Sequence, residues 1–304
     1  MELRDADLAV RTRGLTKNFG KRTVVDGLDL AIPRGGVYGF LGPNGSGKST
    51  TMKMLLGLLH PSAGQVFLLG EDPWGEARAR LMPRIGSMIE HPPGYGHLTG
   101  AENMRLLARL LNLETTRIDR ALELVRLTDH RDRLQRTYSL GMKQRLGIAM
   151  ALAREPELLI LDEPTNGLDP AGIEEIRELM IHLASGGVTV MISSHLLDEI
   201  DRMADILGVL SQGRLVFQGS RKELFERSIP DLLVVTPQAN AAANLVRGCR
   251  LERNGIRVQG CGQEDAARLI VRLVQAGIPI HEVRRIQQSL EEVFMDLTGG
   301  AEAL

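Results

Sequence analysis

The sequence predicts an α/β fold, with a parallel β-sheet followed by a smaller α+β domain. Short apolar segments that suit buried strands lie at 37–41, 85–89, 158–161 and 188–192. Segments with helical periodicity lie between them, and strands that alternate with helices favour a parallel sheet covered on both faces. Because residues 101–152 are almost purely helical, we expect a helical subdomain, at about 91–153, beside the sheet.

The first elements are β-rich. Residues 8–12 and 23–32 carry the alternation and turns of strands. Strand 37–41 ends in a glycine-rich loop, and helical periodicity follows from Ser49 to Leu58. We therefore expect strands up to about residue 36, and then a strand–loop–helix unit.

Capping signals mark the helices of the middle region. Thr99 and Glu102 have the spacing of a capping box that opens a helix toward Leu111. A second helix is predicted at 117–127, and Ser139 can cap a third that extends to about Arg154. Strand 158–161, helix 171–184 and strand 188–192 complete the α/β part.

A change of pattern after Gly219 predicts a second domain. Residues 220–227 form a short helix and Pro230 breaks the chain, so we place the boundary between domains 1–228 and 229–304. The elements then expected are strand 232–235, helix 239–247, two short strands around Gly255, helix 264–275, strand 278–283 and a last helix capped by Ser289 with Glu292.

Composition excludes several classes of protein. The 304 residues include 37 basic and 38 acidic side chains, so the chain lacks the positive excess of a dedicated nucleic-acid binder and we expect no nucleic-acid partner. No apolar run approaches the roughly 20 residues of a membrane-spanning helix, and charges occupy the start of the chain, where a signal peptide is apolar. Cys249 and Cys261 have no metal-ligand spacing. We therefore expect a cytoplasmic protein.

A phosphate-binding motif is the strongest chemical signal. The residues after strand 37–41 match G-x-x-x-x-G-K-[ST], and they are Gly42, Pro43, Asn44, Gly45, Ser46, Gly47, Lys48, Ser49 and Thr50. Glycines let backbone N–H groups converge on phosphate oxygens, and the helix N-terminus adds a favourable dipole. Lys48 can bridge the β- and γ-phosphates, and the Ser49 hydroxyl can bind Mg²⁺.

Two carboxylates follow the buried strand 158–161. Asp162 can reach Mg²⁺ through water, and Glu163 is placed to polarise an attacking water. His195 directly follows another buried strand. A lone histidine in such a place is usually structural, and it gains a functional interpretation only from the residues around it.

Together these motifs resemble the ATP-binding cassette (ABC) ATPases over residues of about 8 to 220. Residues 138–145 stand where the family has its signature motif, LSGGQ, with Ser139 and Gly141 kept and Leu140 and Met142 departing from the pattern. Three single residues match other family positions: Asp169 the D-loop, His195 the switch histidine and Phe19 the aromatic that stacks on adenine.

The resemblance implies a P-loop ABC ATPase fold: a RecA-like core, an antiparallel β subdomain and an α-helical subdomain, here with a small C-terminal α+β domain. It implies ATP and Mg²⁺ as ligands and a head-to-tail homodimer, in which Ser139 and Gly141 serve the γ-phosphate held by the partner protomer. It also implies a separate integral membrane permease, with this chain peripheral on the inner face of the cell membrane.

Glu90 is an informative departure from the family, which usually has glutamine at the end of this strand. The carboxylate, followed by residues 98–103, looks like the bacitracin-resistance and lantibiotic-immunity branch. A carboxylate binds Mg²⁺ more strongly than an amide, so Glu90 joins Ser49 and Asp162 as a predicted metal ligand and Glu163 and His195 as a predicted catalytic residue. The alternative is an exposed loop glutamate without a metal role.

We therefore expect an ATP-hydrolysing subunit that powers export of an antibiotic, a lantibiotic-type peptide or a hydrophobic drug. One alternative is the ATPase of another ABC transporter, such as an importer. A soluble ABC protein of translation or DNA maintenance is the other, although this chain has one phosphate loop and no long heptad run. The C-terminal domain resembles one appended to many drug-export ATPases, where dimer support, partner contact and a structural cap are all open.

Overall fold

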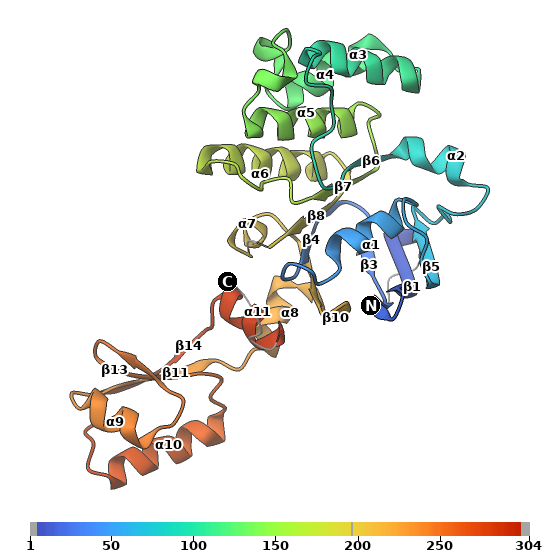
Figure 1. Ribbon diagram of the computed structural model, residues 1–304. Helices are drawn as coiled ribbons and strands as arrows, with labels where there is room; N and C mark the ends of the chain where they lie inside the picture. The colour runs from blue at the N-terminus through green and yellow to red at the C-terminus, as the bar shows by residue number, and fades with distance from the viewer. Residues whose placement is uncertain (1–4, 196, 299–304) are drawn as a thin grey trace. The chain divides into compact units, whose positions relative to one another are not determined.

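The computed structural model describes residues 5–195 and 197–298 (Figure 1). The chain divides into two compact units, the first extending to Ser220 and the second beginning at Arg221. The boundary predicted at 228/229 thus falls after helix α8 (Arg221–Arg227), whereas the structure assigns α8 to the second unit because it packs on α11 (Leu290–Thr298). In the described ranges, no helix has the length and apolar character needed to cross a bilayer.

The first unit contains a six-stranded sheet with the order β10-β9-β4-β8-β7-β6. Its strands are β4 (Gly36–Leu41), β6 (Ile85–Met88), β7 (Leu158–Asp162), β8 (Thr189–Ser194), β9 (Ile206–Ser211) and β10 (Arg214–Ser220). All neighbours pair in parallel except the edge strand β10, which is antiparallel to β9. The predicted parallel sheet is confirmed, although the sequence analysis did not find β9 and β10.

A second, antiparallel sheet comes from the N-terminal region. It consists of β1 (Leu8–Phe19), β2 (Arg22–Leu28), β3 (Ala31–Pro33) and β5 (Ala63–Leu68). Strand β1 pairs with each of the other three. Leu15 and Leu30 of this region share one buried cluster with Phe40 of β4 and Met52 of the following helix. This packing fixes the loop between β4 and that helix from both sides.

The helices described in the first unit are α1 (Lys48–Leu55), α2 (Arg78–Leu81), α3 (Gly100–Leu111), α4 (Thr115–Leu124), α5 (Leu140–Leu152), α6 (Pro170–Ser185) and α7 (Leu197–Asp201). The short helices α2 and α7 were not predicted, whereas the others begin close to their predicted starts. Helices α3, α4 and α5 pack together, as expected for the helical subdomain (Figure 1). The capping box is confirmed: Thr99 Oγ1 accepts from the Glu102 N–H, and the Glu102 carboxylate accepts from the Thr99 N–H.

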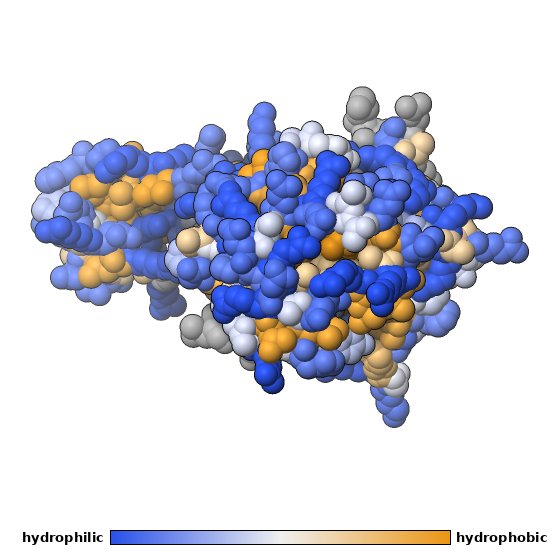
Figure 2. Space-filling model, turned by 90° about the horizontal axis from the view of Figure 1, so that it is seen from above, coloured by the Kyte–Doolittle hydropathy of each residue, from blue (hydrophilic) through white to orange (hydrophobic). Residues whose placement is uncertain are grey.

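Polar side chains cover most of the face shown in Figure 2, where apolar side chains gather in small groups. Large apolar side chains that are exposed include Phe19 and Leu140, each with 49% of its surface accessible. Phe19 is a predicted nucleotide-binding residue, and Leu140 lies between two others, Ser139 and Gly141. Isolated exposed apolar residues are ordinary on a protein surface, so exposure alone assigns these two no role.

The second unit carries a β-α-β-β-α-β arrangement between helices α8 and α11. Its elements are β11 (Asp231–Val235), α9 (Ala239–Leu245), β12 (Arg250–Glu252), β13 (Gly255–Val258), α10 (Gln263–Gln275) and β14 (Glu282–Ile286). The antiparallel sheet has the order β12-β13-β11-β14, so the first and third strands are central, as in the split βαβ fold. Leu232, Ile256 and Leu273 are fully or almost fully buried in its core.

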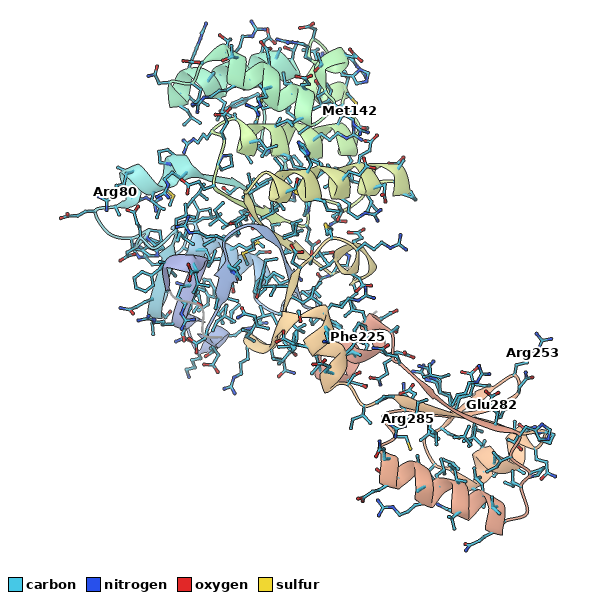
Figure 3. All side chains as sticks on the ribbon, turned by 180° about the vertical axis from the view of Figure 1, so that it is seen from behind. Arg80, Met142, Phe225, Arg253, Glu282 and Arg285 are labelled. Carbon is cyan, nitrogen blue, oxygen red and sulfur yellow. The ribbon has the colours of Figure 1, made fainter. Side chains whose placement is uncertain are left out.

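The last strand was predicted too early, at 278–283, whereas β14 runs from Glu282 to Ile286. Ile278 instead closes α10, since its N–H donates to the carbonyl of Leu273 at 3.1 Å. Strand β14 is an edge strand whose side chains are mostly exposed, and its charged sequence is typical of a solvated loop (Glu282 and Arg285 in Figure 3). The predicted cap of the last helix is confirmed, because Ser289 Oγ accepts from the Glu292 N–H at 3.2 Å.

A buried ion pair joins three elements of the second unit. Asp231 is fully buried, and its Oδ2 accepts from Arg257 Nε at 2.7 Å. Nη2 of the same arginine lies 2.8 Å from Oε1 of Glu292 on α11. Although burial opposes its ionisation, the pKa of Glu292 is lowered, because the backbone of Ser289 and the charge of Arg257 favour the carboxylate. The network therefore links β11, β13 and α11.

We expect Arg257→Ala to lower the free energy of unfolding of the second unit by about 3 kcal/mol, because Asp231 would keep a buried charge without its partner. Hydrogen exchange of the full chain, read on peptides from 221–298, measures this change. Arg250→Ala is the control: its Nη1 lies 4.0 Å from Glu292 and its side chain is 62% exposed. Equal losses of protection in the two variants would contradict the prediction.

Candidate functional site

The loop between β4 and α1 is shaped to surround an anion. Gly45 and Gly47 have positive φ angles of 79° and 108°, and a Cβ at Gly47 would lie 2.8 Å from the carbonyl oxygen of Val24. Helix α1 begins at Lys48, so its unpaired N–H groups face the loop. The Ser46 hydroxyl is buried without a hydrogen-bond partner in the described structure. A buried donor of this kind fits a ligand with acceptor oxygens.

Lys48 lies within this loop. Its Nζ donates to the carbonyl oxygens of Gly42 at 2.6 Å and Pro43 at 3.3 Å, and the side chain is only 5% exposed. Burial lowers the pKa of Lys48, while the nearby charges of Glu163 and Asp162 act in the opposite direction. The ammonium group is therefore a poorly solvated cation at the base of the loop, where an anionic ligand would stabilise it.

Ser193 holds the two predicted carboxylates at the end of β7. It pairs with Asp162 across the β7–β8 ladder. Its hydroxyl donates to Asp162 Oδ1 at 2.5 Å and accepts from the Glu163 N–H at 3.0 Å. Glu163 adopts a left-handed backbone with φ of 46°. One hydroxyl group thus fixes both residues at the point where the chain leaves the sheet.

Glu163 contacts the predicted histidine and the predicted lysine. Its Oε2 lies 3.2 Å from His195 Nδ1 and accepts from Asn166 Nδ2 at 3.3 Å. Its Oε1 lies 3.9 Å from Lys48 Nζ. The structure therefore brings Lys48, Glu163 and His195, which are far apart in the sequence, into one contiguous group.

A cavity of about 490 Å³ adjoins this group. Its lining comes from Ser49, Glu90, His91, Pro92, Leu140, Gln144, Asp162, Glu163 and Asn166. All three predicted magnesium ligands are among these residues. The described residues contain no cluster of three His, Cys, Asp or Glu side chains able to hold a metal by themselves. Mg²⁺ commonly binds one or two carboxylates together with waters and substrate phosphates, so the oxygen donors at this cavity fit such a site.

Glu90 follows β6 in a left-handed conformation with φ of 67°. Its carboxylate forms an ion pair with Nζ of Lys53 on α1. The hydrogen bond and the charge of Lys53 lower the pKa of Glu90. The side chain is 58% exposed, so Glu90 lies at the open rim of the cavity.

Comparison with known proteins identifies the family. The family described as ABC transporter matches residues 25–166. The bacitracin transport ATP-binding protein of Enterococcus faecalis is 39% identical over 302 residues, which cover 97% of this chain and 97% of the relative. This chain belongs to the ABC transporter family. The family assignment makes the chain an ATP-hydrolysing, ATP-binding subunit.

Two further comparisons support the ABC assignment. The lantibiotic transport ATP-binding protein of Streptococcus pyogenes is 42% identical over 226 residues, covering 72% of this chain and 97% of the relative. The solved structure of an ATP-binding subunit of an ABC transporter aligns with a TM-score of 0.66 and 28% identity, covering 72% of this chain and 92% of that one. The predicted ABC ATPase fold is thus confirmed.

The residues predicted to form the signature motif lie at the start of α5. Ser139 is the N-cap, and its hydroxyl accepts from the Met142 N–H at 3.2 Å (Met142 in Figure 3). Leu140, which replaces a family glycine, packs its side chain over Gly167, where a Cβ would collide with it. Gly167 has a φ of 74°, so this position also favours glycine for its backbone. Leu140 therefore packs the start of α5 against the turn that precedes α6.

Of the predicted nucleotide-binding residues, Ser49 alone lines the cavity, and the rest of the phosphate loop adjoins it. Phe19, Ser139, Gly141 and Asp169 lie outside both the lining and the phosphate loop. Asp169 caps α6 by accepting from the Gly172 N–H at 3.1 Å. Phe19 ends β1, and Nζ of Lys17 lies 5.1 Å from the centre of its ring. In this structure Ser139 and Asp169 thus serve as helix caps.

Sequence reasoning missed Ser193, Asn166 and Lys53. Ser193 depends on the register between β7 and β8, and Asn166 on the turn after Glu163, neither of which is visible in the sequence. Lys53 left a usable signal, because it is one of six lysines and follows Ser49 by one helical turn.

Proposed function

We propose that this chain is the ATPase subunit of an exporter that moves an antibiotic, a lantibiotic-type peptide or a hydrophobic drug through a separate membrane subunit. The observation that carries the proposal is the match to a bacitracin transport protein over 97% of both chains, which includes the second unit. The lantibiotic transport protein, matched over 97% of its own length, supports the same substrate class.

In the proposed reaction, Glu163 acts as the general base that polarises the attacking water. Its carboxylate lines the cavity, and the contacts with Asn166 and His195 orient it. His195 contacts the same carboxylate at 3.2 Å and would bind the γ-phosphate beside it. Lys48 and the N–H groups of residues 42–50 would hold the phosphates, and electrostatic stabilisation by such donors is a large term in phosphoryl transfer.

ATP and Mg²⁺ are the proposed ligands. Ser49, Asp162 and Glu90 would hold the metal, because their oxygens line one cavity next to the phosphate loop. When bound, Mg²⁺ would neutralise phosphate charge. We infer that Glu90 supports hydrolysis and its coupling to transport. Phe19 would stack on adenine.

The proposed assembly is a head-to-tail homodimer on a membrane permease. Ser139 and Gly141 lie at the start of α5, outside the cavity lining, so they are available to a nucleotide on a second copy. Asp169 follows Leu168, whose side chain would meet a Cβ at Gly141. This contact supports a D-loop that acts beside the signature motif. The names of the relatives as transport proteins support a permease partner and a place on the inner face of the membrane.

The transport proposal predicts lower cellular accumulation of the exported compound. The chain is co-expressed with a membrane protein that co-purifies with it, and uptake of labelled bacitracin, a lantibiotic and daunorubicin is measured in sensitive cells. We expect at least one compound to accumulate less and cells to become resistant to it.

Glu163→Gln in the same cells is the matched control, since it keeps the complex and removes the proposed base. Accumulation should return to the level of cells without the complex. Higher accumulation with the wild-type complex would instead indicate import. Unchanged accumulation of all three compounds would contradict the proposed substrate classes.

A further inference from the structure

Lys53 makes an ion pair that the functions proposed above do not use. Its Nζ contacts Oε1 of Glu90, so the pair joins the segment after β6 to the last turn of α1. The side chains of Lys53 and Glu90 are 31% and 58% exposed, so solvent and salt weaken the attraction between them. Lys53 is not among the residues that line the cavity, whereas Glu90 is.

Helix geometry places Lys53 close to the proposed metal site. Residues four apart lie on the same face of a helix, so Lys53 follows Ser49 one turn along α1. Ser49 lines the cavity together with Glu90. The ion pair therefore holds the Glu90 carboxylate next to the face of α1 that carries Ser49.

The negative charges around the cavity explain why the ion pair between Lys53 and Glu90 affects nucleotide binding. Asp162, Glu163 and Glu90 all line the cavity next to the phosphate loop, and their negative charges oppose binding of a triphosphate in that loop. Lys48 lies near Glu163, and Ser193 donates to Asp162. Lys53 supplies the compensating charge for Glu90. An amide at position 90 would need no such partner.

We propose that Lys53 is a positioning residue for Glu90: it holds the carboxylate against α1 and compensates its charge, so that the site accepts a nucleotide before Mg²⁺ is bound. This inference rests on the proposed nucleotide site. Without Lys53, Glu90 would face the phosphates as an uncompensated anion, and binding would depend more strongly on the metal.

Nucleotide binding with and without Mg²⁺ tests the proposal on the full chain. A fluorescent ATP analogue is titrated into wild type, Lys53→Met, Lys53→Arg, Glu90→Gln and the Lys53→Met/Glu90→Gln double variant, in EDTA and in excess Mg²⁺. We expect Lys53→Met to weaken binding about threefold in EDTA and less in Mg²⁺, as for the loss of one partly exposed pair. Lys53→Arg should bind as wild type.

The double variant separates positioning from a general loss of positive charge. In the Glu90→Gln background, Lys53→Met should have little effect, because the carboxylate that needs compensation is gone. Lys222→Met, at an 86% exposed position of the second unit, controls for net charge and should match wild type.

If Lys53→Met lowered the affinity for the analogue equally with Glu90 and with Gln at position 90, or lowered it in neither case, the role of Lys53 would be wrong. The proposed nucleotide site would not be affected by that result. A wild-type chain that binds the analogue under neither condition would overturn the site itself, and this inference with it.

Discussion

Replacing Glu163 with glutamine is expected to slow ATP hydrolysis by about 10²- to 10⁴-fold, the usual contribution of a positioned general base. The substitution keeps the size of the side chain and its hydrogen bond with Asn166. Lys48, the phosphate loop and Ser49 are untouched, so ATP should still bind. Because hydrolysis no longer follows binding, the ATP-bound dimer should accumulate.

Phosphate release measures the rate of ATP hydrolysis, and light scattering measures the oligomeric state. With ATP, and in detergent with the permease present, the Glu163→Gln chain should elute as a dimer of ATPase subunits, whereas wild type should return to its nucleotide-free state after turnover. Glu226→Gln, at a 61% exposed position of the second unit, is the matched control. Hydrolysis by Glu163→Gln at the control rate would show that another group activates the water, and a monomer with bound ATP would contradict the dimer.

Local signals explain why much of the fold could be predicted. Buried parallel strands such as β7 begin with a continuous apolar run, and such a run indicates a strand without knowledge of its neighbours in the sheet. Caps act within one turn, so Thr99 with Glu102 and Ser289 with Glu292 mark helix starts correctly. The edge strands β10 and β14 carry a weaker signal, because β14 is charged and β10 alternates weakly. Position in the sheet does not decide the outcome alone, since the edge strand β6 was predicted and the internal strand β9 was not.

The sequence predicts the part of the site whose backbone is set by a local motif. It does not predict the contacts that depend on which strands and helices lie side by side. Lys48 and Ser49 follow from the loop that precedes α1. The contact between Ser193 and Asp162 requires the β7–β8 register, and the ion pair between Lys53 and Glu90 requires β6 to end beside α1. No spacing within the chain encodes either contact.

This difference bears on the interpretation of Glu90. Alone in the sequence, a carboxylate in place of an amide indicates a metal ligand. In the structure the same carboxylate already has a cationic partner, so its affinity for Mg²⁺ must be gained in competition with Lys53. A metal-binding role for Glu90 agrees with its ion pair to Lys53 when the pair forms in the nucleotide-free state and Mg²⁺ replaces Lys53 as the partner of Glu90.

Lys48→Ala is expected to weaken ATP binding by about 10- to 100-fold, because a charge-assisted hydrogen bond to phosphate contributes about 1.5–3 kcal/mol. The buried ammonium group donates to two loop carbonyls, and burial already lowers its pKa. A phosphate would therefore offer it a better partner than the loop does. Titration with the fluorescent ATP analogue in excess Mg²⁺ measures the loss.

Two controls distinguish a lost ligand contact from a damaged loop. Lys222→Ala removes an exposed lysine from the second unit and should bind as wild type. Thermal unfolding without nucleotide shows whether Lys48→Ala remains folded, and the loop should persist because Ser46 and Thr51 keep their backbone hydrogen bonds to Pro43 and Gly47. If the folded variant bound ATP as tightly as wild type, Lys48 would serve the loop carbonyls alone, and the phosphates would have to be held by the backbone N–H groups and by Ser46.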